Sequence, residues 1–129
     1  MLNKLKRAAL GAHTPHDKAT AASKPVPMPL PAQVRILMSQ HIGAPAKALV
    51  KKGDEVFVGT KIGEAGGFVS ANIHSSVSGT VAAVEAFRLS NGRTCDSVVI
   101  KTDGKQTVDP AVQPPVVTDK ASFMAAVRE

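Results

Sequence analysis

The stretches KKGDEVFVGTKIGE (51–64) and SSVSGTVAAVEA (75–86) decide the fold class of this chain. The first has a basic start, a Gly-Asp turn, a short strand-like run, a glycine turn and a second run. The second enters a Ser-Gly turn and leaves it through Thr80-Val81. Val56 and Val58 alternate with other residues, so both side chains fall on one face of a strand. Two successive hairpin patterns of this kind predict a small, mostly β domain.

Short strand-like runs separated by glycines continue on both sides of these stretches. The expected strands are VRILM (34–38), AKALV (46–50), EVFVG (55–59), KIGE (61–64), VSGTVAAVEAF (77–87) and DSVVIKTDG (96–104). Several short strands at intervals of about 8–12 residues predict an all-β sandwich or small barrel. Val77, Val81 and Val84 reach one face only through a bulge or a twist. Asn91-Gly92 tolerates positive φ and predicts a hairpin turn between the two longest strands.

The composition divides the chain of 129 residues into four parts. We expect a basic tail with a proline-rich strap at 1–33, a β domain at 34–104, a linker at 105–118 and a helix at 119–129. The strap contains KPVPMPLPAQ (24–33), in which alternate prolines fix φ and remove backbone donors, so it should be extended. We expect it to lie along the domain surface, with binding to a proline-reading groove as the alternative.

The last residues, KASFMAAVRE, have the pattern of an amphipathic helix. Thr118-Asp119 can cap its N-terminus, and Phe123 and Val127 fall on one face. An amphipathic helix after a proline-bearing linker is typical of the start of another domain. We therefore expect this chain to be a fragment whose following domain is truncated.

The net charge of +6 is concentrated near the start, where residues 1–24 hold five basic side chains and one aspartate. The tail could be solvated, bind an acidic partner, or lie on an anionic membrane through Leu2, Leu5 and Leu10. We expect no nucleic-acid partner, because the chain has no Tyr or Trp for base stacking. No apolar run approaches the roughly 20 residues of a membrane span. A soluble chain on the cytosolic side is expected.

The sequence predicts no catalytic, cofactor-binding or metal-binding residue. A single cysteine, Cys95, cannot hold an iron–sulfur cluster or form an internal disulfide, and as a small side chain at a strand start it is expected to be inert. His41 and His74 with a third ligand could form a metal site, although histidines satisfied by backbone groups are favoured. GEAGG (63–67) lacks the features of a nucleotide-binding loop. It predicts a tight hairpin with Gly66 and Gly67 at positive φ.

The hairpin pattern resembles the biotinyl/lipoyl type of β domain, the barrel-sandwich hybrid, over about 35 residues. In such carriers the prosthetic group is attached to a lysine at the hairpin tip. The corresponding tip here, AGGFVSANIH (65–74), contains no lysine, and Lys61 lies at the start of the preceding strand. Covalent biotin or lipoate is therefore not expected. A free-standing binding module without the attachment lysine stays open as one interpretation.

A more specific resemblance rests on four stretches, GAHTPHDKATAASKPV (11–26), PMPLP (27–31), MSQHIGAPAKALVKKGDEVFVGTKIGE (38–64) and GGFVSANIHSSVSGTV (66–81). Together they resemble the N-terminal domain of the C subunit of the Rnf complex, an ion-translocating ferredoxin:NAD oxidoreductase. Ala12 departs from this pattern, since many relatives have glycine there. Related N-terminal domains occur in a cobalamin reductase and in the sodium-pumping quinone reductase, which stay as alternatives.

The resemblance implies electron transport by a peripheral subunit on the cytoplasmic face of the cell membrane. The parent protein would carry two 4Fe–4S clusters and bind flavin and NAD, but none of those motifs lies in this chain. Docking and scaffolding are the remaining role, with the downstream domain of the same polypeptide and other membrane complex subunits as partners, so membrane association would be indirect. The candidate interface is Gly66, Gly67, Phe68 and Val69 at the hairpin tip. In the alternative, Phe68 closes the domain's own core.

Overall fold

A computed structural model describes residues 17–128. The expectations for Leu2, Leu5 and Leu10, and for the first half of the basic tail, lie outside the described residues. The described elements are β1 (Gln33–Leu37), β2 (Lys47–Ala48), β3 (Glu55–Val56), β4 (Lys61–Glu64), β5 (Ile73–His74), β6 (Gly79–Arg88), β7 (Thr94–Thr102) and α2 (Lys120–Arg128).

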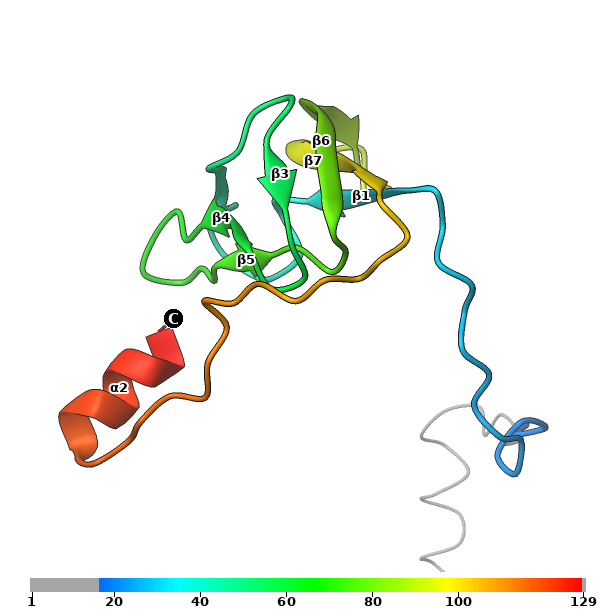
Figure 1. Ribbon diagram of the computed structural model, residues 1–129. Helices are drawn as coiled ribbons and strands as arrows, with labels where there is room; N and C mark the ends of the chain where they lie inside the picture. The colour runs from blue at the N-terminus through cyan, green and yellow to red at the C-terminus, as the bar shows by residue number, and fades with distance from the viewer. Residues whose placement is uncertain (1–16, 129) are drawn as a thin grey trace, which may run out of the picture.

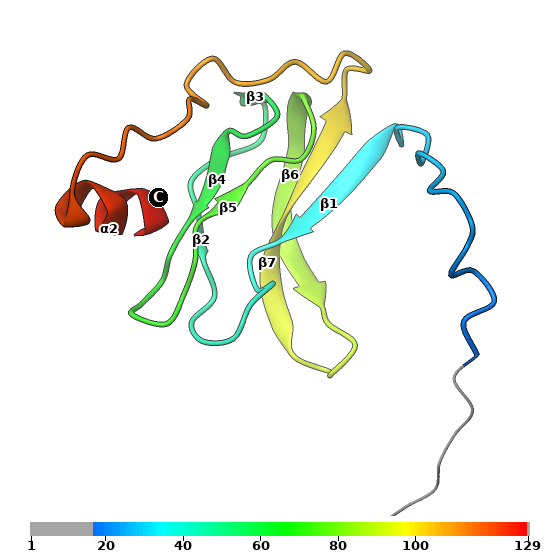
Figure 2. The same cartoon turned by 90° about the horizontal axis from the view of Figure 1, so that it is seen from below.

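The strands form two antiparallel sheets (Figures 1 and 2). One has the order β1-β7-β6-β3 and the other the order β2-β4-β5. Apolar side chains from both sheets meet in one buried core, which contains Ile36, Met38, Ala46, Val56, Ile62, Ile73, Val77, Val81, Val98 and Ile100. The predicted fold class, a mostly β barrel-sandwich hybrid, is confirmed.

The longest hairpin, β6–β7, has both irregularities that its sequence predicts. The register of β6 against β7 shifts between Val81 and Ala83, which is a β-bulge. The bulge leaves Val81 in the core at 1% exposure, whereas Val84 beyond it is 37% exposed. At the turn, Gly92 adopts a φ of 83°, and the Leu89 N–H donates to the Arg93 carbonyl over 2.7 Å. The predicted bulge and turn are confirmed.

The proline-rich strap is extended, but most of it runs away from the domain (Figure 1). Its last residues are fastened, because Thr102 donates from its N–H to the Ala32 carbonyl and from its hydroxyl to the Pro31 carbonyl. Val26 and Met28 are exposed. The prediction that the strap lies along the domain surface is therefore wrong for this part of it.

Residues that follow β7 remain attached to the domain as far as Val112. Ser78 accepts a hydrogen bond at its hydroxyl from the Thr107 N–H and donates one to the Asp103 carboxylate. Val58 forms a parallel bridge with Val108, which adds a short strand-like contact beside β3. The predicted linker 105–118 thus begins as a part of the folded domain, and residues 113–118 run exposed to the helix.

Helix α2 confirms the predicted cap and amphipathic pattern. The Asp119 carboxylate accepts a 2.7 Å hydrogen bond from the Ser122 N–H, as an N-cap residue does. Phe123 and Val127 remain exposed, so the apolar face of α2 is not buried against the two sheets.

Candidate docking surface

Two loops lie side by side at the end of the domain opposite the strap (Figure 2). Loop 39–46 is the part after Met38 of the connection between β1 and β2, and loop 65–72 joins β4 to β5. We call these two loops the tip. The Ala44 N–H donates to the Val69 carbonyl over 2.9 Å, and the Ser70 hydroxyl donates to the Ala44 carbonyl over 2.8 Å. The two loops therefore form one hydrogen-bonded unit.

Loop 65–72 is also fixed from within. The Ala65 N–H donates to the Asn72 side-chain oxygen and the Gly66 N–H to the Ser70 hydroxyl, both over 3.0 Å. Side chains thus accept hydrogen bonds from backbone N–H groups in a loop that lies outside the β-sheet hydrogen-bond pattern. These bonds hold the tip in a defined shape.

Glycines allow the two loops to approach more closely than side chains would permit. A Cβ atom on Gly43, which has a φ of +100°, would lie 2.0 Å from the Val69 carbonyl oxygen. A Cβ atom on Gly66 would lie 2.2 Å from the Pro45 carbonyl oxygen. Neither Gly66 nor Gly67 has a positive φ, so that prediction is wrong. Glycine is needed at position 66 because the neighbouring backbone leaves no room for a side chain, and not because of its own φ.

His41 is a structural residue of the tip. Its Nε2 accepts from the Ala71 N–H at 3.3 Å, so its Nδ1 carries the proton and donates to the Ile42 carbonyl at 3.1 Å. With both ring nitrogens engaged by the backbone, His41 has no lone pair left for a metal ion. No group of three or more His, Cys, Asp or Glu side chains within residues 17–128 could hold one. The expected backbone-satisfied histidine is found at this position.

Apolar side chains of the tip face the solvent. Phe68 is completely exposed, Ile42 is 87% exposed and Val69 is 52% exposed. The alternative in which Phe68 closes the domain's own core is therefore wrong. The 16 residues of the tip include no Asp, Glu, Lys or Arg, although such residues make up 20% of the chain. Depletion of charge around exposed aromatic and aliphatic side chains is typical of the centre of a protein interface.

Ile42 is the tip residue that the sequence interpretation missed. It lies in loop 39–46, which is separated in sequence from Phe68 but hydrogen-bonded to the same hairpin. The uncharged run SQHIGAPA (39–46) before a strand was the available signal.

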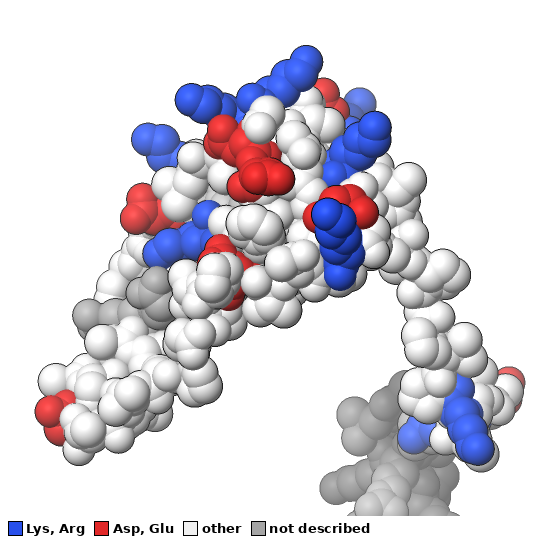
Figure 3. Space-filling model, in the orientation of Figure 1, with Lys and Arg blue, Asp and Glu red and all other residues white. Residues whose placement is uncertain are grey.

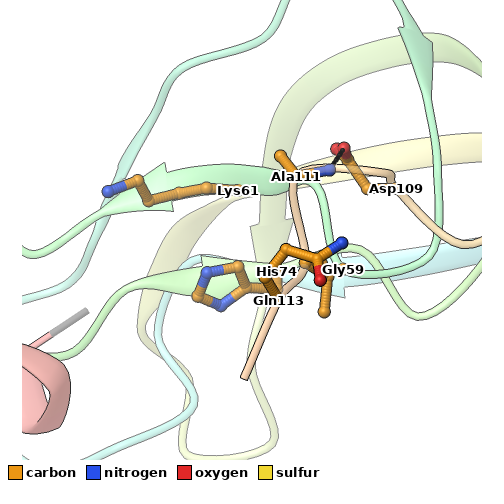
Figure 4. Close-up of a pocket in the computed structure, with 7 residues that line it drawn as sticks. Gly59, Lys61, His74, Asp109, Ala111 and Gln113 are labelled. Atoms are coloured by element: carbon orange, nitrogen blue, oxygen red, sulfur yellow. Dashed lines mark hydrogen bonds between the residues drawn. The ribbon is translucent and has the colours of Figure 1, made fainter. Parts of the chain in front are cut away.

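A separate pocket of about 400 Å³ lies between the β4–β5 pair and the segment that follows β7 (Figure 4). Asp109 at its rim accepts hydrogen bonds from the Thr60 hydroxyl and the Ala111 N–H, and these bonds lower the pKa of its carboxyl. The side chain of Lys61 extends away from Asp109 (Figure 4). The polar groups around this pocket do not converge on one point, and Asp109 fastens the chain that leaves the domain.

Two further expectations from the sequence concern Cys95 and membrane-spanning segments. Cys95 is a buried side chain near the start of β7, opposite Phe87. Over residues 17–128 we find no helix of the length and hydropathy needed to cross a bilayer.

Two antiparallel sheets that enclose one core define a barrel-sandwich hybrid domain, and in this chain the hairpin between β4 and β5 has no lysine at its tip, residues 65–72. The sequence narrows this class to one family. Residues 6–105 match the family model described as the RnfC barrel sandwich hybrid domain, and the chain belongs to this family.

The chain is similar to C subunits of ion-translocating oxidoreductase complexes from several organisms. The chain is 48% identical over 105 residues to the C subunit of the Na⁺-translocating ferredoxin:NAD⁺ oxidoreductase complex of Acetobacterium woodii, a match that covers 81% of this chain and 24% of the relative. It is 42% identical to the C subunit of the proton-translocating ferredoxin:NAD⁺ oxidoreductase complex of Clostridium ljungdahlii, covering 74% of this chain and 21% of the relative. The C subunit of the ion-translocating oxidoreductase complex of Rhodobacter capsulatus is 38% identical, with 74% and 19% covered. The chain thus spans a quarter or less of these relatives.

Proposed function

We propose that this chain is the non-catalytic N-terminal docking and scaffolding domain of the C subunit in a membrane-bound, ion-translocating ferredoxin:NAD oxidoreductase. The single observation that carries the proposal is the tip, which holds a completely exposed Phe68 on a rigid, uncharged surface. An exposed aromatic side chain on a preorganised loop loses little conformational freedom on binding and is a favoured interface anchor.

The cofactors of the complex belong, in this proposal, to the rest of the C subunit and its neighbours. The 4Fe–4S clusters, the flavin and the NAD site require cysteine groups and a nucleotide-binding loop, which this sequence does not include. The domain would contribute placement: its tip docks on the downstream domain or on another protein of the complex. The subunit's peripheral position at the cytoplasmic face of the membrane would follow from these contacts.

Replacement of Phe68 by alanine in the full-length C subunit tests the proposal. We expect the variant to leave the complex during purification of the membranes, because the anchor is lost. The free energy of unfolding of the isolated domain should change by no more than about 0.5 kcal/mol, because an exposed side chain contributes little to folding. Phe87→Ala is the matched control, since Phe87 is a half-exposed aromatic side chain on β6, outside the tip.

Two results would contradict the proposal. Full retention of the Phe68→Ala protein in the complex would show that the tip does not dock. A loss of several kcal/mol of folding stability would show that Phe68 belongs to the domain's own packing, since that is about the cost of removing a buried phenylalanine.

A further inference from the structure

A groove of about 690 Å³ lies between the β4–β5 hairpin and the C-terminal part of α2. Phe68 and its hairpin neighbours line one side, and Val127 lines the other. No Asp, Glu, Lys or Arg side chain is among the lining residues. On the described part of the face seen in Figure 3, α2 and its connector are mostly uncharged, whereas Lys, Arg, Asp and Glu side chains are interspersed over the two sheets. The groove thus has the apolar side chains Phe68 and Val127 on opposite walls, and its polar lining residues are Ser70, Asn72 and His74.

Helix α2, which forms one wall, has a largely exposed apolar face. It has nine residues, and its apolar side chains Phe123, Met124 and Val127 are 54%, 43% and 67% exposed. A helix shorter than about 12–15 residues is only marginally stable in water by itself. The N-cap at Asp119 helps, but it does not cover the apolar face. A second apolar surface against this face would stabilise α2.

The helix is held near the hairpin by a short connector. Val112 packs at Gly59, where a Cβ atom would lie 2.4 Å from its side chain, so the connector starts from a fixed point. Pro114 and Pro115 then restrict the exposed segment that leads to α2. The chain consequently carries whatever follows α2 in a longer polypeptide to the side of the groove.

We propose that the groove between the hairpin and α2 receives an apolar, uncharged surface of the part of the C subunit that follows this domain. The inference rests on the proposed function and names the occupant of its docking surface. The matched region is only 24% of the Acetobacterium woodii relative, so most of that relative's chain lies outside this domain. A covalently attached occupant has a high effective concentration at the groove. An anionic lipid surface is disfavoured, because such contacts use Lys and Arg.

Photo-crosslinking in the full-length C subunit, purified without the other proteins of the complex, tests the occupant. With p-benzoylphenylalanine in place of Phe68, we expect a crosslink to a peptide beyond residue 129. The same probe in place of Phe87 should give none. Val127→Gln, which keeps a helix-forming residue, should lower the Phe68 crosslink yield at least fivefold. Ala125→Gln, on the opposite side of the same helix, should leave the yield unchanged.

Three results would overturn the inference. Crosslinks that form only in the assembled complex, and only to a different polypeptide, would assign another occupant while leaving the docking function intact. A crosslink from position 68 to α2 would show that the helix itself closes the groove. The absence of any crosslink, in the purified subunit or in the complex, would show that the groove is open to solvent.

Discussion

Alanine at Gly43 would meet two separate penalties in the folded domain. Gly43 has a φ of +100°, a conformation that costs an L-residue about 1–2 kcal/mol. The added Cβ would also lie 2.0 Å from the Val69 carbonyl oxygen, a backbone atom that cannot rotate away. The loops would have to separate, which threatens the 2.9 Å hydrogen bond between Ala44 and Val69. We expect overpacking of this kind to cost a further 1–3 kcal/mol or so.

Two other glycines separate the penalties. Gly53 has nearly the same φ, +97°, but nothing lies within 4 Å of its Cβ position, so Gly53→Ala carries the conformational cost alone. Gly66 lacks a positive φ, but its Cβ would lie 2.2 Å from the Pro45 carbonyl oxygen, so Gly66→Ala carries the steric cost alone. The loss of stability in Gly43→Ala should approach the sum of the other two, about 2–5 kcal/mol.

Thermal unfolding of the isolated domain measures all three variants. In a domain of this size 1 kcal/mol corresponds to roughly 4–8 °C in Tm. Gly43→Ala should therefore lower Tm by about 10 °C or more, and each of the other two by about half as much. The reasoning about loop contact would be refuted if Gly43→Ala and Gly53→Ala had the same Tm, or if Gly66→Ala were as stable as the parent.

Three further changes test other parts of the structure. The Thr60 hydroxyl and a backbone N–H lower the pKa of Asp109 in the folded domain. The ionised Asp109 therefore stabilises the fold above about pH 4, and this contribution is lost as the pH falls through the lowered folded pKa. Asp109→Asn should make stability depend less steeply on pH in an acid unfolding experiment, and an unchanged curve would contradict this. Ile62→Ala removes a fully buried core side chain and should cost about 2–5 kcal/mol in urea unfolding, so a loss below about 1 kcal/mol would place Ile62 outside the core. Glu85→Ala breaks a 2.7 Å ion pair with Arg35 that is partly exposed, and a loss of less than about 1 kcal/mol is expected in the same assay.

Local patterns in the sequence were sufficient for the elements whose causes are local. The Asn91-Gly92 turn and the Asp119 cap follow from the residues at those positions, and the structure has both. The bulge after Val81 follows from an apolar spacing that an unbroken strand cannot place on one face. These elements define the sheets, so the fold class could be predicted.

Features that depend on distant contacts could not be predicted in the same way. The two residues of β5, Ile73 and His74, are too few to show any alternation, and pairing with β4 makes them a strand. The steric need for Gly66 comes from Pro45, which lies far from it in sequence. Phe68 could be proposed as an anchor from its place in a glycine-rich hairpin, but its complete exposure depends on how the two loops meet.

The hydrogen bonds from Thr102 to Pro31 and Ala32 place the start and the end of the two-sheet core next to each other. If this core were inserted into another polypeptide, the two ends of the insertion would therefore lie close together. Such a unit can be moved between host proteins, inserted in a surface loop or circularly permuted without pulling its surroundings apart. The geometry makes the two-sheet core a transferable module.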